Sequence, residues 1–251
     1  MSAHPEHYET VAADSTLTLG VVHIWQIPLS IQADRIRDCR SILSQDENHR
    51  ADRFYFDRDR NRFIAARSAI RRILSRYVEM APADLVFCYG LKGKPELSPQ
   101  HAGPDIKFNL SHSRDLGLLA VARAQSVGVD IEFVDYDFAS DEIATRFFSV
   151  KEVDTWRNLP SNQKAAAFFS CWTRKEAYIK ALGEGLSRPL HSFDVAFGPG
   201  VEAALLRVAS LPHEAGRWSM YNVDAPEGYA AALVIEGQGH RLLRRRWEPQ
   251  F

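Results

Sequence analysis

The chain reads Trp-Thr-Arg-Lys-Glu-Ala-Tyr-Ile-Lys-Ala-Leu-Gly-Glu-Gly-Leu from Trp172 to Leu186, and this stretch organises the interpretation of the whole sequence. The run from Ala165 to Leu182 is rich in good helix formers, lacks Pro and Gly, and stops at Gly183, which suits the left-handed turn at a helix end. A helix is therefore predicted. Glu176 and Lys180 are four residues apart, so their side chains share one face of it. Most such pairs are solvated ion pairs of little energetic value, and a catalytic role needs support from the rest of the chain.

Length, charge and cysteine content limit the class of protein. The 251 residues suit one large domain or two halves. With 31 Lys+Arg against 32 Asp+Glu, the charge favours neither nucleic acid nor an anionic membrane as a partner. Cys39, Cys88 and Cys171 are far apart, which argues against a disulfide framework or a thiolate zinc site and favours a reducing, cytoplasmic location. Residues 1–19 lack a basic start and an apolar run, so we expect a loose tail rather than a signal peptide or membrane anchor.

An arginine-rich segment runs from Arg50 to Tyr77 and has the apolar periodicity of a helix. Arg50 and Arg62 belong to a group of arginines around the predicted first turn, where guanidinium groups and free backbone N–H groups together suit a phosphate. Several aspartates are interleaved with them. A solvated charge run that pairs with itself is therefore the simpler interpretation of this segment taken alone.

Two carboxylates lie on a predicted strand, Val127-Gly-Val-Asp-Ile-Glu132. Strand alternation places Asp130 and Glu132 on one face and the apolar residues on the other. The two acids repel each other unless a cation or solvent lies between them. Mg²⁺ is held in this way when substrate phosphates complete its octahedral shell. The alternative is an exposed edge strand with two solvated acids.

Two further stretches can hold an anion. The turn from Gly90 to Pro95 includes Lys94, and its glycines allow the backbone to approach a ligand closely, although this signal is weak alone. Phe108 to Ser113 ends in Ser111, His112 and a second serine, three hydrogen-bonding side chains that can bind a phosphate. A histidine beside serines is more often part of an ordinary turn.

The sequence also suggests an internal duplication. Each half has early strand material, one long helix (60–77 and 165–182), and later an apolar run of small residues. We therefore expect an N-terminal half over 1–124 and a C-terminal half over 125–251 that carries the acidic strand and the Trp172 helix. A site between the halves is favoured, since sites often lie between such units. The arginine run at 241–246 is expected to be a solvated tail.

In order, Gly93-Lys-Pro95, Phe108-Asn-Leu-Ser-His-Ser113, Gly128-Val-Asp-Ile-Glu132 and Trp172-Thr-Arg-Lys-Glu-Ala-Tyr-Ile-Lys-Ala181 resemble the motifs of the Sfp-type 4'-phosphopantetheinyl transferases. The resemblance spans about residues 50–193. It implies an α+β fold, a pseudo-dimer of two similar α/β halves in one monomeric chain, with coenzyme A and Mg²⁺ in the cleft. It also implies that 4'-phosphopantetheine is moved from coenzyme A to a serine of an apo acyl or peptidyl carrier protein, which leaves adenosine 3',5'-bisphosphate.

The resemblance implies catalytic and metal-binding roles for four residues. Asp130, Glu132 and Glu176 match the family's ligands for Mg²⁺, which would bridge the coenzyme A diphosphate and orient it for in-line attack. Glu176, or a water that it orients, would take the proton from the incoming serine hydroxyl. Lys180 matches a lysine that contacts the diphosphate and would protonate the leaving phosphate.

Other matched positions concern coenzyme A binding. The expected contacts are Arg50, Arg62, Lys94, Ser111, His112, Lys175 and Lys180. Ser111 and His112, with the two arginines, match contacts to the 3'-phosphate, Lys94 falls beside the adenine site, and Lys175 adds positive charge. Glu47 departs from the pattern, because it occupies a position where a lysine is common in relatives.

Two alternatives stay open at this point. The same carboxylates would serve another metal-dependent phosphate-processing enzyme, such as a phosphodiesterase that uses water as the nucleophile. A non-catalytic module that binds a carrier protein or an anion through the arginine-rich segment is the second alternative. Its nucleic-acid version is opposed by the neutral charge and the interleaved acids, since nucleic-acid binding normally needs a basic surface.

Overall fold

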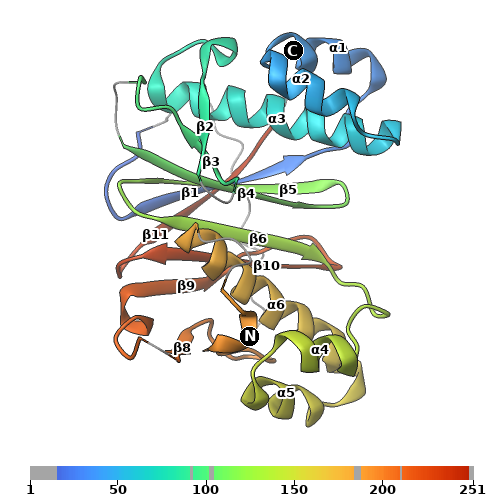
Figure 1. The fold of residues 1–251 in the computed structure, drawn as a ribbon, viewed down its shortest axis with the longest axis vertical. Coiled ribbons are helices and arrows are strands. Elements are labelled where there is room, and N and C mark those ends of the chain that lie inside the picture. Colours follow the sequence, from blue (N-terminus) through green and yellow to red (C-terminus); the bar gives the residue numbers. More distant parts are fainter. Residues whose placement is uncertain (1–15, 91–92, 102–104, 184–187, 210, 249–251) are drawn as a thin grey trace, which may run out of the picture.

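The computed structural model describes residues 16–90, 93–101, 105–183, 188–209 and 211–248. Residues 1–15 of the predicted tail lie outside the described residues, as do 91–92 of the Lys94 turn and 184–187 of the Trp172 stretch. The remaining chain forms two stacked groups of helices and strands (Figure 1). The predicted α+β architecture is confirmed.

The N-terminal half combines a sheet of strand order β11-β1-β5-β4 with a long helix, α3, that packs on one face of it. Neighbouring strands of β1, β5 and β4 are antiparallel. The bounds in this half are β1 (Val21–Pro28), α1 (Ile36–Ser41), α2 (Gln45–Asp52), α3 (Asp57–Val78), β2 (Phe87–Tyr89), β3 (Pro95–Leu97), β4 (Ile106–Ser113) and β5 (Leu116–Arg123).

The C-terminal half repeats this plan with the antiparallel sheet β6-β10-β9 and a second long helix, α6. Helix α6 packs along β6 and β10. The bounds in this half are β6 (Val127–Phe133), α4 (Asp141–Phe147), α5 (Val150–Arg157), α6 (Ser161–Leu182), β7 (Phe193–Val195), β8 (Leu205–Val208), β9 (Trp218–Asn222), β10 (Tyr229–Glu236) and β11 (Arg241–Arg246).

The two sheets pack against each other, with α3 and α6 on their outer faces. Alternation along β5 explains this layering, because Leu119 and Val121 join the core beneath α3, whereas Leu118 and Ala120 join the core between the sheets. The apolar face of β6, represented by Val129, meets them there. The predicted alternation of the acidic strand is therefore confirmed, and its acids point to the other face.

The two long helices explain the internal likeness of the halves. Each has 22 residues and is followed by a residue in the left-handed region, Glu79 at φ 53° and Gly183 at φ 71°. Both predicted helices are present and begin a few residues earlier than expected. Across the described ranges, no helix is both long enough and apolar enough to cross a membrane.

The expectation of a solvated tail at 241–246 is wrong. These residues form β11, which pairs in parallel with β1, with Val21 opposite Arg241 and Gln26 opposite Arg246. The guanidinium of buried Arg245 lies 5.4 Å from the ring centroid of Trp25. The end of the C-terminal half thus completes the sheet of the N-terminal half and ties the two together.

Candidate active site

Asp130 lies at the centre of the contact between the halves. It is 1% exposed on β6, and its Oδ1 accepts hydrogen bonds from Ser111 Oγ at 2.7 Å and Lys180 Nζ at 2.6 Å. Its Oδ2 is buried and has no hydrogen-bond partner among the described residues. An unpaired buried carboxylate oxygen is costly, so the alternative of a solvated acid on an exposed edge is excluded for Asp130.

Gly128 allows α6 to approach β6 closely enough for these contacts. A Cβ at this position would lie 2.1 Å from Ala177 O and 2.3 Å from Ala181 N, inside the helix backbone. Any side chain would therefore push α6 away from the strand. The close approach lets Lys180 reach Asp130 and also Ser111 Oγ, at 2.8 Å.

Strand β4 supplies a row of polar side chains along β6. Asn109 Oδ1 accepts from Val129 N at 2.8 Å, and Ser113 Oγ donates to Glu132 Oε2 at 2.9 Å. With Ser111, these are every second residue of β4, so all three face the same way. The contact of Asn109 was not predicted from the sequence, and Ser113 was expected only as a possible phosphate-binding hydroxyl, although the period-two spacing of the polar residues was a signal for both contacts.

The negative charge of Asp130 affects the pKa values of both Glu132 and Glu176. Burial and then the negative charge of Asp130 raise the pKa of Glu132 to about 7, against the hydrogen bond from Ser113. The same two causes raise the pKa of Glu176, and the positive charge of Lys180 opposes them. The site therefore holds more negative charge than its protein cations neutralise.

This charge distribution fits a hard divalent cation. Among the described residues, no three acidic, histidine or cysteine side chains are grouped closely enough to form a complete metal site. Mg²⁺ rarely needs such a cage, because it keeps several water or phosphate ligands and takes only a few carboxylates from the protein. The orphaned Oδ2 of Asp130 and the two acids with raised pKa values beside it are compatible with such partial coordination, although the side chains are not grouped as a complete set of ligands among the described residues.

His112 follows Ser111 on β4 and is affected by the charge of Arg62. Its pKa is lowered by partial loss of hydration and then by the positive charges of Lys180 and Arg62, although the ring is partly open to solvent. Arg62 pairs with Asp115 at 2.8 Å. The structure thus brings Arg62 near His112, whereas Arg50 is exposed and its guanidinium lies 5.4 Å from the ring centroid of Phe63.

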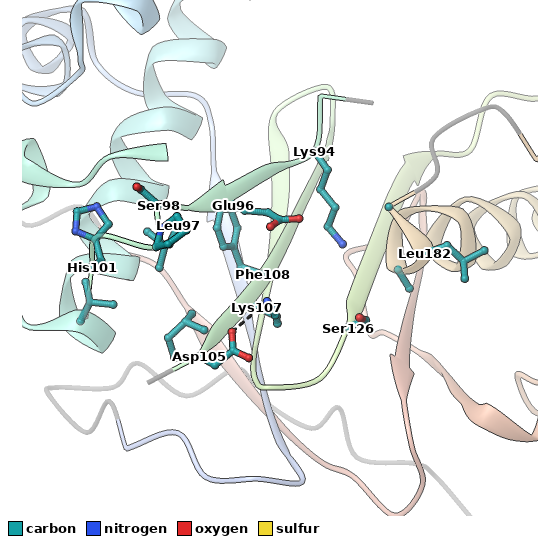
Figure 2. A pocket seen from close by; sticks show the side chains of 15 residues that line it. Lys94, Glu96, Leu97, Ser98, His101, Asp105, Lys107, Phe108, Ser126 and Leu182 are labelled. Carbon is teal, nitrogen blue, oxygen red and sulfur yellow. Dashed lines mark ion pairs between the residues drawn. The ribbon is translucent and has the colours of Figure 1, made fainter. Parts of the chain in front are cut away.

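Lys94 joins the two halves at a cavity of about 370 Å³ between β3, the start of β4 and the end of α6. Figure 2 shows its side chain reaching from β3 toward β6 and the end of α6. Its Nζ donates to Val127 O at 3.0 Å and Lys180 O at 2.7 Å. Burial lowers the pKa of Lys94 to about 8, against the negative charge of Glu96.

The structure contradicts the assignment of Lys175 to the coenzyme A site. Its side chain is fully buried in the C-terminal half, and Nζ donates to Leu190 O and Phe193 O and pairs with Glu152. The physical reason is the helical period: adjacent residues lie about 100° apart around the axis. Lys175 therefore faces the core, whereas Glu176 is half-buried and close enough to Asp130 and Lys180 for their charges to affect its pKa.

Glu47 has a structural role in this chain. It is 2% exposed, and its two carboxylate oxygens accept hydrogen bonds from Arg67 and Arg71 of α3. Its Oε2 also accepts from Ser44 N at 3.0 Å, which completes a capping box at the start of α2. The carboxylate is turned into the N-terminal half and satisfied there.

Carboxylates, a lysine and hydroxyl groups in a cleft between duplicated halves are suited to handling a phosphate through a metal. Comparison with known proteins identifies the family. The profile of the 4'-phosphopantetheinyl transferase superfamily matches residues 126–234, and that of the 4'-phosphopantetheinyl transferase N-terminal region matches residues 31–124.

Two curated relatives extend this match over most of the chain. 4'-Phosphopantetheinyl transferase HetI of Nostoc sp. is 37% identical over 236 residues, which cover 94% of this chain and 93% of the relative. 4'-Phosphopantetheinyl transferase Sfp of Bacillus subtilis is 33% identical over 155 residues, 62% of this chain and 66% of the relative. This chain belongs to the 4'-phosphopantetheinyl transferase superfamily and is a transferase of the phosphopantetheine arm.

Proposed function

We propose that the cleft around Asp130 carries out the transfer of 4'-phosphopantetheine from coenzyme A to a serine of an apo acyl or peptidyl carrier protein. The buried Oδ2 of Asp130 is the observation that carries the proposal, because it has no hydrogen-bond partner within the described part of the chain and an added ligand would relieve it. The phosphodiesterase alternative loses its support, since the family is a family of transferases.

Mg²⁺ is the ion that this donor set suits, with Asp130, Glu132 and Glu176 as its protein ligands. When bound, it would neutralise the charge of the coenzyme A diphosphate and of the leaving group. The carboxylates must be ionised to bind it. The raised pKa values of Glu132 and Glu176 oppose ionisation in the absence of a cation, and the positive charge of a bound ion would lower both pKa values.

Glu176 and Lys180 divide the proton transfers. The serine oxygen bonds to the β-phosphorus while the bond from that phosphorus to the bridging oxygen breaks. Glu176, or a water that it orients, accepts the serine proton. Lys180 lies one helical turn away. Its ammonium leaves Asp130 and binds the diphosphate. It then donates a proton to the departing adenosine 3',5'-bisphosphate.

Two cavities are proposed to take the two ends of coenzyme A. Lys94 lies at the cavity of about 370 Å³, on the side where we place the adenosine, and Ser111, His112, Arg62 and Arg50 are proposed to bind the 3'-phosphate. A second cavity of about 250 Å³ borders Glu132 and is walled by aromatic side chains. It suits the less polar pantetheine arm. Because one chain supplies the residues of both halves at the site, we propose a monomer. The three dispersed cysteines support the proposal of a cytoplasmic location.

The decisive experiment combines the purified enzyme with coenzyme A, Mg²⁺ and a panel of apo fatty-acid, polyketide and peptide carrier proteins. Intact mass spectrometry should show a gain of one phosphopantetheine arm, which disappears when a chelator removes the metal. Asp130→Asn should abolish the gain, while Asp141→Asn, which changes an exposed acid of α4, should keep it. Wild-type transfer by Asp130→Asn, or undiminished transfer with the chelator, would refute the metal assignment.

A further inference from the structure

Lys175, the residue directly before Glu176, is buried and fully hydrogen-bonded. The inference drawn from its contacts rests on the proposed function of the cleft. An ammonium group has three N–H donors. In Lys175 these face three acceptors, namely Leu190 O at 2.9 Å, Phe193 O at 2.6 Å and Glu152 Oε2 at 2.7 Å. The side chain is 0% exposed. No donor of Lys175 remains for a phosphate, as far as the described residues define its surroundings.

Glu152 extends this contact to two further elements. It is 3% exposed, its Oε1 accepts from Val195 N at 2.8 Å, and its Oε2 also accepts from Ser149 N at 2.8 Å, at the start of α5. One ion pair thus joins the middle of α6, the start of α5 and strand β7. All of its polar atoms are engaged, unlike those of Asp130.

Arg174 makes a parallel contact from the preceding position of α6. It is buried, and its guanidinium donates to the carbonyl oxygens of Ala196 and Val201 and to Asn222 Oδ1, the last at 2.7 Å. Lys175 therefore holds the chain at the start of β7, and Arg174 holds the chain that follows it. They fix the helix in the turn that also carries Glu176.

Stability alone is a weak reason for such an arrangement. Taking a lysine and a glutamate out of water is expensive, and apolar residues of similar size often stabilise a core equally well. What a charged pair with directional partners adds is a defined orientation. Since neighbouring residues of a helix point about 100° apart, fixing Lys175 toward the core also fixes the direction of Glu176 toward Asp130.

We propose that Lys175, through Glu152, is a positioning residue of the transferase. It sets the rotation of α6 about its axis, so that Glu176 and Lys180 face Asp130 in the cleft. Lys175 itself contacts neither coenzyme A nor the metal.

The test compares Lys175→Met and Glu152→Gln with Lys164→Met, which removes a cation near the start of the same helix, beside Trp156. Assays use the full chain at a temperature where circular dichroism shows each variant folded. For both core variants we expect kcat to fall by about 10–100-fold and the Mg²⁺ concentration for half-maximal rate to rise by a similar factor, the usual effect of losing groups that orient metal ligands. The KM for coenzyme A should stay within about twofold, and Lys164→Met should behave as wild type.

The double variant Glu152→Gln/Lys175→Met covers the case in which a single variant does not fold, because it leaves neither charge buried alone. It should fold and keep the low kcat and the raised Mg²⁺ requirement. A raised KM for coenzyme A in Lys175→Met but not in Glu152→Gln would show direct contact and overturn the proposal. Normal kcat and Mg²⁺ dependence with only a lowered melting temperature would also overturn it. Failure of the wild-type enzyme to require Mg²⁺ would instead refute the proposed function of the cleft.

Discussion

Glu47 and Asp130 are two buried acids with similar surroundings but different hydrogen bonding. Each is almost fully buried, at 2% and 1% exposure, and each meets cationic side chains of a 22-residue helix, α3 for Glu47 and α6 for Asp130. Both oxygens of Glu47 are bound by arginines. Only one oxygen of Asp130 is bound, and the other meets no donor within the described ranges.

The difference separates a structural ion cluster from a binding site. Burial of a carboxylate is tolerated when every lone pair is used. Protein groups alone satisfy the carboxylate of Glu47, and its contacts hold α2 against α3. Asp130 does not meet this condition with the described residues alone, and the proposed metal would supply the missing partner. Saturation of the hydrogen bonds, rather than burial or charge, is therefore the property that distinguishes the two.

The largest expected effect is on catalysis at Asp130. Asp130→Asn keeps the size of the side chain but removes the negative charge that pairs with Lys180 and is proposed to bind the metal. We expect the rate of phosphopantetheine transfer to fall by about a thousandfold or more, as for the loss of a principal electrostatic group. The rate per folded molecule of Glu47→Gln should stay near wild type. Comparable losses of rate in the two variants, measured by intact mass over time, would erase the distinction between the acids.

The next largest effect should be on stability at Glu47. Glu47→Gln leaves Arg67 and Arg71 facing each other without a counter-charge in a buried place. Breaking such a cluster from one side lowers the free energy of unfolding by about 3–5 kcal/mol. Urea denaturation followed by circular dichroism measures it. A loss no greater than that of Asp130→Asn would contradict the structural role.

A smaller loss of stability is expected at Gly128. In Gly128→Ala the new methyl group meets the backbone of α6 and forces the helix outward. Overpacking of this kind costs about 1–3 kcal/mol, and more where backbone must move. The displaced helix should also weaken the response to Mg²⁺. Gly216→Ala is the matched control, because its methyl group would meet no described atom within 4 Å. Equal melting temperatures for the two variants would argue against the close approach.

The smallest effect concerns pH. In the metal-free protein the pKa of Glu132 is raised from 4.5 to about 7, so between these values the folded state binds more protons than the unfolded state. The free energy of unfolding therefore falls as pH rises through that range. Mg²⁺ needs the ionised carboxylate, so its apparent affinity should rise by up to about tenfold per pH unit below about 7.

Isothermal titration calorimetry at several pH values measures this dependence. Glu132→Gln removes the titrating group, so its weaker Mg²⁺ affinity should change much less with pH. Glu47→Gln should keep the wild-type slope, since Glu47 lies outside the proposed metal site. A wild-type affinity that is flat across this range would contradict Glu132 as a ligand that must lose a proton.

Local patterns in the sequence were sufficient for much of the architecture. The helix from Ala165 onward and its end at Gly183 followed from residue propensities, and the separation of acids from apolar residues on 127–132 followed from the period of a strand. The likeness of the halves followed from the repeated order of elements. The matched motifs also pointed to Asp130, Ser111 and Lys180, which the structure brings into contact.

Three outcomes were beyond the sequence because they depend on distant partners. Lys175 and Lys180 are the same residue type on one helix, and only the packing of α6 decides that the first enters the core and the second the cleft. The run at 241–246 became a strand because β1, at the other end of the chain, offers it hydrogen bonds. Glu47 was satisfied by arginines of α3 rather than left for a ligand.

The sequence by itself determined the family, the α+β class, the long helices and the alternation that points the acids of 127–132 to one face. Each follows from short-range propensity, periodicity or motif order. Only the tertiary structure decided which acids are saturated and which cation faces the cleft. The physical reason is that a hydrogen bond needs partner atoms within about 3 Å, and residues far apart in the chain come that close only when the two halves pack together.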